Sequence, residues 1–254
     1  MLYLIGLGLY DEKDLSLRAL EILKGCDEVY VELYTGVFQG SAEKLEELTA
    51  RPVRILFRKD LEENPEGNVL MNSRNMHIAL LVPGDPLVAT THIDLILRAR
   101  KLGIETKVIH SSSIYSAIGE TGLQLYKFGK TTTLAFPEKG YFPTSPYDVI
   151  KENLAKGLHT LVLLDVKAEE KRFMTVKDAI ELLLDIEHSK KEGVFTPNRA
   201  CIGAARIGGD SVIKAGTAED LRKEKFGDPP HIIIVPGKLH FVEEEALEMY
   251  GLKG

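Results

Sequence analysis

The chain has 254 residues, 44% of them hydrophobic and 28% charged, which is an ordinary globular composition. This length allows one large or two medium-sized domains with a substantial core. The formal net charge of −6 argues against a broad nucleic-acid-binding face, so we expect no nucleic acid among the partners.

Two cysteines, Cys26 and Cys201, lie near apolar segments and predict reduced, partly buried thiols. No cluster of cysteine and histidine has the spacing of a zinc site. Segment 1–5 reads as a strand and lacks the basic leader and cleavage site of a signal peptide. No apolar run approaches the ~20 residues of a membrane span. The sequence therefore predicts a cytoplasmic protein with no membrane segment and no metal.

The first part of the chain alternates apolar strands with amphipathic or charged helices. Segment 58–74 is polar and has no clear pattern. This alternation predicts a mainly parallel sheet. Strands are expected at 2–5, 29–33, 53–57, 78–82 and 106–109, and helices at 17–24, 42–48, 93–102 and from 115.

The second half has a different pattern, with a long loop at 137–146 that contains glycine and prolines. Glycine recurs between 119 and 129, so the domain boundary is expected there. The predicted strands are 131–136, 159–166, 200–207 and 231–235, and the predicted helices are 147–155, 176–188, 218–225 and 243–250.

The stretch 78–92 predicts a strand, a tight loop and a helix start. The apolar run stops at Pro83-Gly84-Asp85-Pro86, which cannot continue a strand ladder. Thr90 and Thr91 offer hydroxyls that can cap the next helix. Ligands of open α/β sheets collect at the carboxyl ends of strands, where Asp85 would lie. An Asx turn that holds only its own backbone is an equally good interpretation of Asp85.

The glycine loop after the first strand does not fit a dinucleotide. In Gly6-x-Gly8 the third glycine of the G-x-G-x-x-G pattern is replaced by Asp11, whose charge would repel a pyrophosphate. No phosphate-binding G-x-x-x-x-G-K-[ST] motif occurs either. A ligand without phosphates, such as S-adenosylmethionine, fits better. The loops at 6–9, 84–86 and 111–113 could approach it closely.

The remaining polar candidates favour structural roles. His92 at a helix start predicts a structural polar contact, and His231 and His240 read as lone, satisfied histidines. Segment 243–245 reads as a solvated helix N-terminus and Lys190-Lys191 as a solvated helix end. No Ser/His/Asp or Cys/His arrangement can be argued from the spacing, so no catalytic residue is assigned.

Several motifs resemble those of the archaeal diphthine synthases, a branch of the tetrapyrrole methylase family. The matching segments cover the chain end to end: 6–18, 84–92, 113–114, 122–129 and 228–240. Cobalamin-pathway members of the wider family usually carry Gly-Pro-Gly-Asp in the first loop. This chain has Gly8-Leu9-Tyr10-Asp11 there, as in the diphthine synthase branch.

The resemblance implies two α/β domains of the tetrapyrrole methylase type, at 1–118 and 119–254, with the cofactor in the cleft between them and a homodimer as the assembly. It implies methyl transfer from S-adenosylmethionine, with S-adenosylhomocysteine as the product. The acceptor would be the amino group of the aminocarboxypropyl-histidine of translation elongation factor 2, giving diphthine for diphthamide biosynthesis. A tetrapyrrole (precorrin or uroporphyrinogen) methylase or a ribosomal-RNA methylase of the same fold is the alternative.

The resemblance also implies the cofactor contacts, residue by residue. In the first domain they fall on Leu9, Asp85, Val88, Ser113 and Ile114. In the second they fall on Leu164, Ala205 and His231. Lys171 and Arg172 are candidates for a basic rim that meets the protein substrate.

Overall fold

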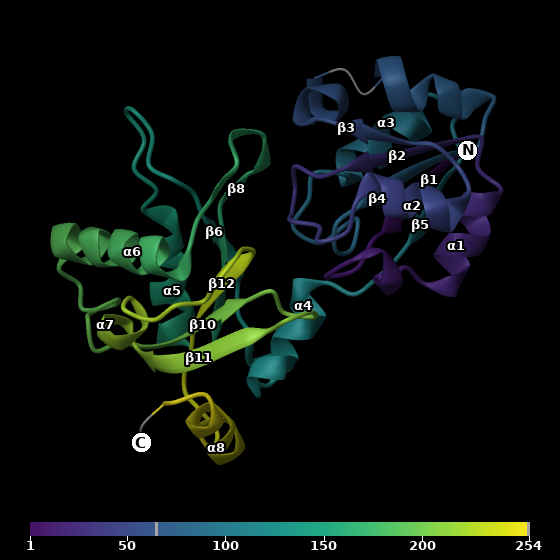
Figure 1. The fold of residues 1–254 in the computed structure, drawn as a ribbon. Coiled ribbons are helices and arrows are strands. Elements are labelled where there is room, and N and C mark those ends of the chain that lie inside the picture. Colours follow the sequence, from purple (N-terminus) through teal and green to yellow (C-terminus); the bar gives the residue numbers. More distant parts are fainter. Residues whose placement is uncertain (64–65, 253–254) are drawn as a thin grey trace. The chain divides into compact units, whose positions relative to one another are not determined.

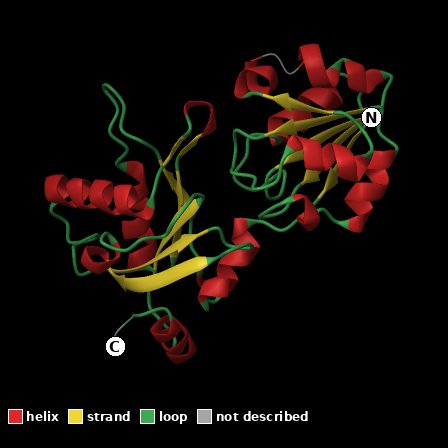
Figure 2. Ribbon diagram, viewed as in Figure 1, coloured by secondary structure: helices red, strands yellow, loops and turns green. Residues whose placement is uncertain are grey.

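The computed structural model describes residues 1–63 and 66–252, and it divides the chain into two compact units, Met1–Ala117 and Ile118–Gly254. Each unit contains a five-stranded sheet with helices packed on it (Figures 1 and 2). The α/β fold class predicted from the sequence is confirmed. Within the described residues, no helix combines the length and apolar character needed to span a membrane.

The sheet of the first unit is parallel throughout, as the alternating pattern predicted. Its strand order is β3-β2-β4-β1-β5. The strands are β1 (Leu2–Gly6), β2 (Glu28–Glu32), β3 (Val53–Leu56), β4 (Ile78–Val82) and β5 (Thr106–Ile109). The helices are α1 (Leu17–Lys24), α2 (Ala42–Thr49), α3 (Ile93–Lys101) and α4 (Ile114–Ala117).

Both faces of this sheet are buried. Along β4, Leu80 packs into a core that includes α3, whereas its neighbour Leu81 packs into a second core that includes α1 and α2. Successive side chains of a strand point to opposite faces, so a strand that is covered on both sides is apolar at every position. This explains the unbroken apolar run at 78–82, all of which is buried.

Two helices of this unit begin at side-chain caps. Ser16 and Ser41 cap α1 and α2, their Oγ atoms accepting from the amides of Ala19 (3.1 Å) and Lys44 (3.2 Å). The predicted threonine cap of α3 is wrong, because its N-cap is His92, without a side-chain hydrogen bond.

The segment left unassigned by the sequence contains short helical turns. Two of these are wide turns of the π type, which apolar periodicity does not reveal. Short turns occur at Glu12–Asp14, Lys59–Glu63, Glu66–Leu70, Asn72–Arg74, Ile118–Thr121, Leu125–Lys127 and Ala168–Glu170.

The sheet of the second unit is mixed, with the order β11-β10-β12-β7-β6. Only the β6–β7 pair is parallel in it. Its strands are β6 (Thr132–Leu134), β7 (Thr160–Leu164), β10 (Ala200–Ala205), β11 (Val212–Thr217) and β12 (His231–Val235). A small antiparallel hairpin adds β8 (Val166–Lys167) and β9 (Arg172–Phe173). The helices are α5 (Ser145–Ala155), α6 (Val176–Lys190), α7 (Ala218–Leu221) and α8 (Phe241–Met249).

Two strand predictions fail in this unit. Strand β11 was missed, because this edge strand buries only the small residues Ala215 and Gly216 and leaves its other four positions half-buried, which gives no strong apolar signal. The strand predicted at 159–166 is interrupted at Asp165. The amide of this residue donates to Leu134 O (3.1 Å), and its Oδ2 accepts from the amide of Phe136 (2.9 Å). The chain therefore leaves the sheet there and begins the hairpin.

Both cysteines are free and buried. Burial raises the pKa of the Cys26 thiol to about 11 and that of Cys201 to about 12. Because the thiolate is the reactive form, both side chains are inert apolar fillers at neutral pH.

Candidate functional site

The loops that follow β1 and β4 are joined to each other at the carboxyl edge of the first sheet. The amide of Gly8 donates to Gly84 O (3.2 Å), and the amide of Gly84 donates to Gly8 O (2.7 Å). A Cβ on Gly6 would lie 2.5 Å from Gly84 O and 2.6 Å from Ser111 Cβ. Gly6, the first glycine of Gly6-x-Gly8, therefore lets three loops meet. Glycine is needed here for this close packing, whether or not a phosphate binds.

A carboxylate orders the loop that carries Leu9. Asp14 Oδ2 accepts hydrogen bonds from the amides of Leu9 (3.0 Å) and Tyr10 (2.7 Å). Gly8 has a φ of +86°, and a Cβ on it would lie 2.3 Å from Asp14 Cβ. The loop is therefore built around the Asp14 side chain, which adds negative charge near a position where a nucleotide phosphate would need positive charge.

Asp85 is 6% exposed and uses both of its carboxylate oxygens within the protein. Oδ1 accepts from the amide of Leu87 (3.0 Å), which forms the Asx turn considered above. Oδ2 accepts from the amide of Ser111 (3.2 Å) and lies 2.8 Å from Nδ1 of His110. Asp85 therefore ties the loop after β4 to the loop after β5.

The other predicted residues of the first unit lie in these same loops. The amide of Val88 donates to Asp85 O (3.1 Å). Ser113 is buried, and its carbonyl accepts the amides of Ser116 (3.1 Å) and Ala117 (3.0 Å), so that α4 begins at Ile114. The structure thus brings all five first-unit residues to one edge of the sheet, in the loops after β1, β4 and β5.

The sequence predicted one member of a buried pair next to this edge and missed the other. His92 makes the structural polar contact that was predicted, and its partner is Glu32, which is fully buried at the end of β2. His92 Nε2 lies 3.1 Å from Glu32 Oε1, while Glu32 Oε2 accepts from the amides of Tyr34 (3.0 Å) and Thr35 (3.1 Å). Glu32 stands in an apolar strand, and only the unusual position of a carboxylate there could have signalled a buried role.

The three predicted residues of the second unit lie on adjacent strands at one edge of the second sheet. Ala205, the last residue of β10, pairs with His231, the first of β12. Leu163 pairs with Ile232, so Leu164 at the end of β7 lies at the same edge. The three residues are 1–7% exposed. Ligand contacts at this edge would therefore be made mainly through the backbone.

The ring of His231 is fully engaged. Its Nδ1 accepts from the amide of Val176 (3.2 Å), and its Nε2 donates to Gly227 O and Asp228 O (both 3.1 Å). These partners fix the neutral Nε2–H tautomer, and burial lowers the pKa of the ring. The side chain fastens the start of α6 to the loop before β12, which agrees with the satisfied histidine predicted from the sequence.

One prediction for the second unit is wrong: Glu243 is not solvated but fully buried. Its Oε1 accepts from the amide of Gln124 (2.9 Å) and lies 3.0 Å from His159 Nε2. Its Oε2 accepts from the amide of His240 (2.8 Å) and forms an ion pair with Lys127. Burial alone would raise the pKa of this carboxyl, but these donors outweigh it and lower the pKa to about 2.

Two buried histidines of the second unit predict a loss of stability in mild acid. Burial lowers the pKa values of His159 and His231 below the ordinary 6.5. Between the folded and unfolded pKa values, the unfolded chain binds protons that the folded chain does not. The contribution of these two neutral histidines to the free energy of unfolding is therefore complete above pH 6.5 and is lost as the pH falls below it. Urea unfolding at a series of pH values should show this decrease.

The matched variants are His159→Gln and His188→Gln. The first removes a buried titrating group and should flatten the pH dependence, whereas the second changes an exposed histidine of α6 and should leave it intact. Equal free energies of unfolding at pH values about one unit above and below 6.5 would contradict the prediction.

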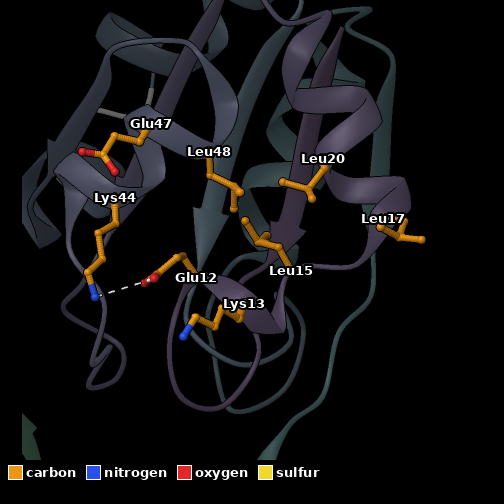
Figure 3. Close-up of a pocket in the computed structure, with 8 residues that line it drawn as sticks. All are labelled: Glu12, Lys13, Leu15, Leu17, Leu20, Lys44, Glu47 and Leu48. Carbon is orange, nitrogen blue, oxygen red and sulfur yellow. Dashed lines mark ion pairs between the residues drawn. The ribbon is translucent and has the colours of Figure 1, made fainter.

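A separate pocket of about 650 Å³ lies in the first unit between the turn at Glu12–Asp14, α1 and α2 (Figure 3). Leu15, Leu20 and Leu48 lie together there, the charged side chains lie to one side of them, and Leu17 points away (Figure 3). The pocket contains none of the predicted cofactor residues. Its lining is Glu12, Lys13, Leu15, Leu17, Leu20, Lys44, Glu47 and Leu48. Across residues 1–63 and 66–252, no three His, Cys, Asp or Glu side chains gather as a metal site would require.

Comparison with known proteins agrees with this architecture. The family model for tetrapyrrole (corrin/porphyrin) methylases matches residues 1–221. The chain therefore belongs to the tetrapyrrole methylase family and is a methyltransferase.

Its relatives place it more narrowly. It is 49% identical to the diphthine synthase of Methanocaldococcus jannaschii, with 98% of each chain covered. It is 48% identical to that of Methanocella arvoryzae, with 100% of this chain and 99% of the relative covered. A crystal structure of a diphthine synthase homologue from Entamoeba histolytica superposes with a TM-score of 0.92 at 41% identity, covering 100% of this chain and 99% of that one. Within the family, the chain belongs to the diphthine synthases, as its motifs indicated.

Proposed function

We propose that this protein transfers methyl groups from S-adenosylmethionine to the amino group of the aminocarboxypropyl-histidine of translation elongation factor 2, giving diphthine for diphthamide biosynthesis. The observation that carries the proposal is the 49% identity to a diphthine synthase over nearly the whole of both chains. Such coverage includes both sheet edges and every motif quoted above.

We assign the cofactor contacts to Leu9, Asp85, Val88, Ser113, Ile114, Leu164, Ala205 and His231. Geometry at the first edge supports a close backbone approach. Gly84 has a φ of +69°, and a Cβ on it would meet only Ser112 O, at 4.0 Å. The Asp14 carboxylate in the first loop disfavours phosphates, and S-adenosylmethionine has none.

Bound S-adenosylmethionine supplies an electrophilic methyl group on a sulfonium, which is an excellent leaving group. The protein's main task is then to hold the acceptor amine in line with that methyl at near-attack distance. The amine must be neutral to attack, and a site that excludes water would disfavour its ammonium form. Asp85 is poorly suited to act as a base, since both of its oxygens already accept hydrogen bonds from the protein.

Incubation with labelled S-adenosylmethionine and elongation factor 2 that carries the unmethylated arm tests the proposal. We expect mass spectrometry to find added methyl groups on that one histidine, and none on elongation factor 2 that lacks the arm. Methylation of a uroporphyrinogen-type ring or of ribosomal RNA, with the arm unchanged, would instead support the alternative methylases of this fold.

Assembly and location follow from the same resemblance. We infer a homodimer, which light scattering at micromolar concentration would show as twice the chain mass. We place the enzyme in the cytoplasm, where its proposed translation-factor substrate acts.

A further inference from the structure

Two projecting segments leave the second sheet at the edge that carries Leu164. The loop 135–144 follows the carboxyl end of β6, and the β8–β9 hairpin follows the carboxyl end of β7. Because β6 and β7 are parallel neighbours, both segments start side by side (Figure 1). Asp165, directly after Leu164, connects their bases through the hydrogen bonds to Leu134 and Phe136.

Contacts further along hold the two segments together. Lys167 of the hairpin forms an ion pair with Glu138 of the loop. The guanidinium carbon of Arg172 lies 3.8 Å from the centre of the Phe136 ring. A guanidinium stacked on a ring loses mobility but keeps its N–H edge available for hydrogen bonds.

The N–H groups of Arg172 are available in this structure. Within residues 1–63 and 66–252 its guanidinium makes no hydrogen bond and no ion pair; the pKa of Glu138 is lowered mainly by Lys167 and, to a smaller extent, by the charge of Arg172. The side chain is exposed, and the Glu138 carboxylate beside the hairpin is engaged by Lys167. An ordered guanidinium with free donors is suited to bind a carboxylate through two parallel hydrogen bonds.

We propose that Arg172 binds the carboxylate of the substrate's aminocarboxypropyl arm and so positions the amine that is methylated; this inference rests on the proposed function. The carboxylate and the amine are attached to the same carbon of the arm. Two hydrogen bonds to the carboxylate therefore fix the position of the amine nitrogen, apart from rotation about the bond that joins the carboxylate to that carbon. The nearby positive charge also disfavours the ammonium form of the amine, which cannot attack.

Phe136 is then a positioning residue for Arg172. The residue is 8% exposed, and its backbone amide holds it at the base of the loop by donating a hydrogen bond to Asp165 Oδ2. Phe136→Leu should keep the apolar contact but release the guanidinium. We expect it to raise KM for the protein substrate about 3–10-fold while kcat changes less, since a mobile arginine still carries the charge.

A binding cycle with four measurements tests the role of Arg172. The affinity of wild-type enzyme and of Arg172→Gln for elongation factor 2, with and without the arm, is measured in the presence of S-adenosylhomocysteine. We expect wild type to bind the factor with the arm about 10–100-fold more tightly than the factor without it, and the variant to lose most of that difference, because a charge-assisted bond contributes only when both partners are present. Arg172→Lys should restore part of it, since it keeps the charge but not the planar fork.

Controls separate the other outcomes. Lys139→Gln changes an exposed cation of the neighbouring loop 135–144 and should alter arm-dependent binding less than about 2-fold. If Arg172→Gln weakened the binding of both forms of the factor equally, the partner of Arg172 would lie elsewhere on the factor. If it weakened the binding of S-adenosylhomocysteine, the partner would be the cofactor. Either result, or an unchanged variant, overturns the inference. The proposed function fails separately, when wild type leaves the arm unmethylated.

Discussion

Replacing Asp85 with asparagine should weaken the binding of S-adenosylhomocysteine by about 1–3 kcal/mol, or roughly 5–150-fold. The substitution keeps the size of the side chain but turns one oxygen into an NH2 group. An NH2 group in place of Oδ1 cannot accept from the amide of Leu87. In place of Oδ2 it cannot accept from His110 or from the amide of Ser111. The loop after β4 would therefore lose either its own Asx turn or its hydrogen bonds to the loop after β5.

Calorimetry with S-adenosylhomocysteine measures this loss directly. Asp94→Asn is the matched control, because Asp94 is an exposed aspartate of the same unit that forms an i,i+4 ion pair with Arg98. It should leave the affinity within about 2-fold of wild type, since exposed pairs contribute little. An Asp85→Asn enzyme with normal affinity and no turnover would show that Asp85 acts in the chemistry and does not support the cofactor site.

Glu243→Gln should lower the free energy of unfolding of the second unit by about 3–5 kcal/mol, as breaking a buried ion pair from one side does. The carboxylate joins α8 to Lys127, His159 and the amide of Gln124, which are distant in sequence. Glutamine keeps the shape but leaves Lys127 without its counter-charge. Its NH2 group also faces a donor, because His159 Nδ1 accepts from Gly237 N and therefore Nε2 carries the proton.

Urea unfolding followed by circular dichroism should show the change. Glu244→Gln, at the exposed neighbouring position of α8, removes the same charge and should shift the free energy of unfolding by less than about 0.5 kcal/mol. If the two variants unfold alike, the helix dipole accounts for both glutamates and the buried cluster adds nothing.

The amino-acid pattern predicted the structural role of a side chain wherever that role depends on near neighbours in the chain. The central strands β1 and β4 are apolar at consecutive positions because both faces are covered there. Their alternation with helices along the chain made the parallel sheet predictable. The caps of α1 and α2 are local in the same way, since Ser16 and Ser41 each contact an amide only three residues away. Strand ends and motifs likewise predicted which loops lie at each sheet edge.

Tertiary structure decided the roles of the charged and polar side chains. Segment 243–245 contains three glutamates that are alike by local pattern, yet only Glu243 is buried, because its partners Gln124 and Lys127 lie more than 100 residues earlier in the chain. Asp85 could be seen in its turn but not in its contact with His110, 25 residues later. The sequence alone determined most of the strands and helices and the family of this protein, whereas the state of each carboxylate depended on donors supplied by distant segments of the chain. Burial of a charge is favourable only where such donors converge, and that convergence exists only in the folded chain.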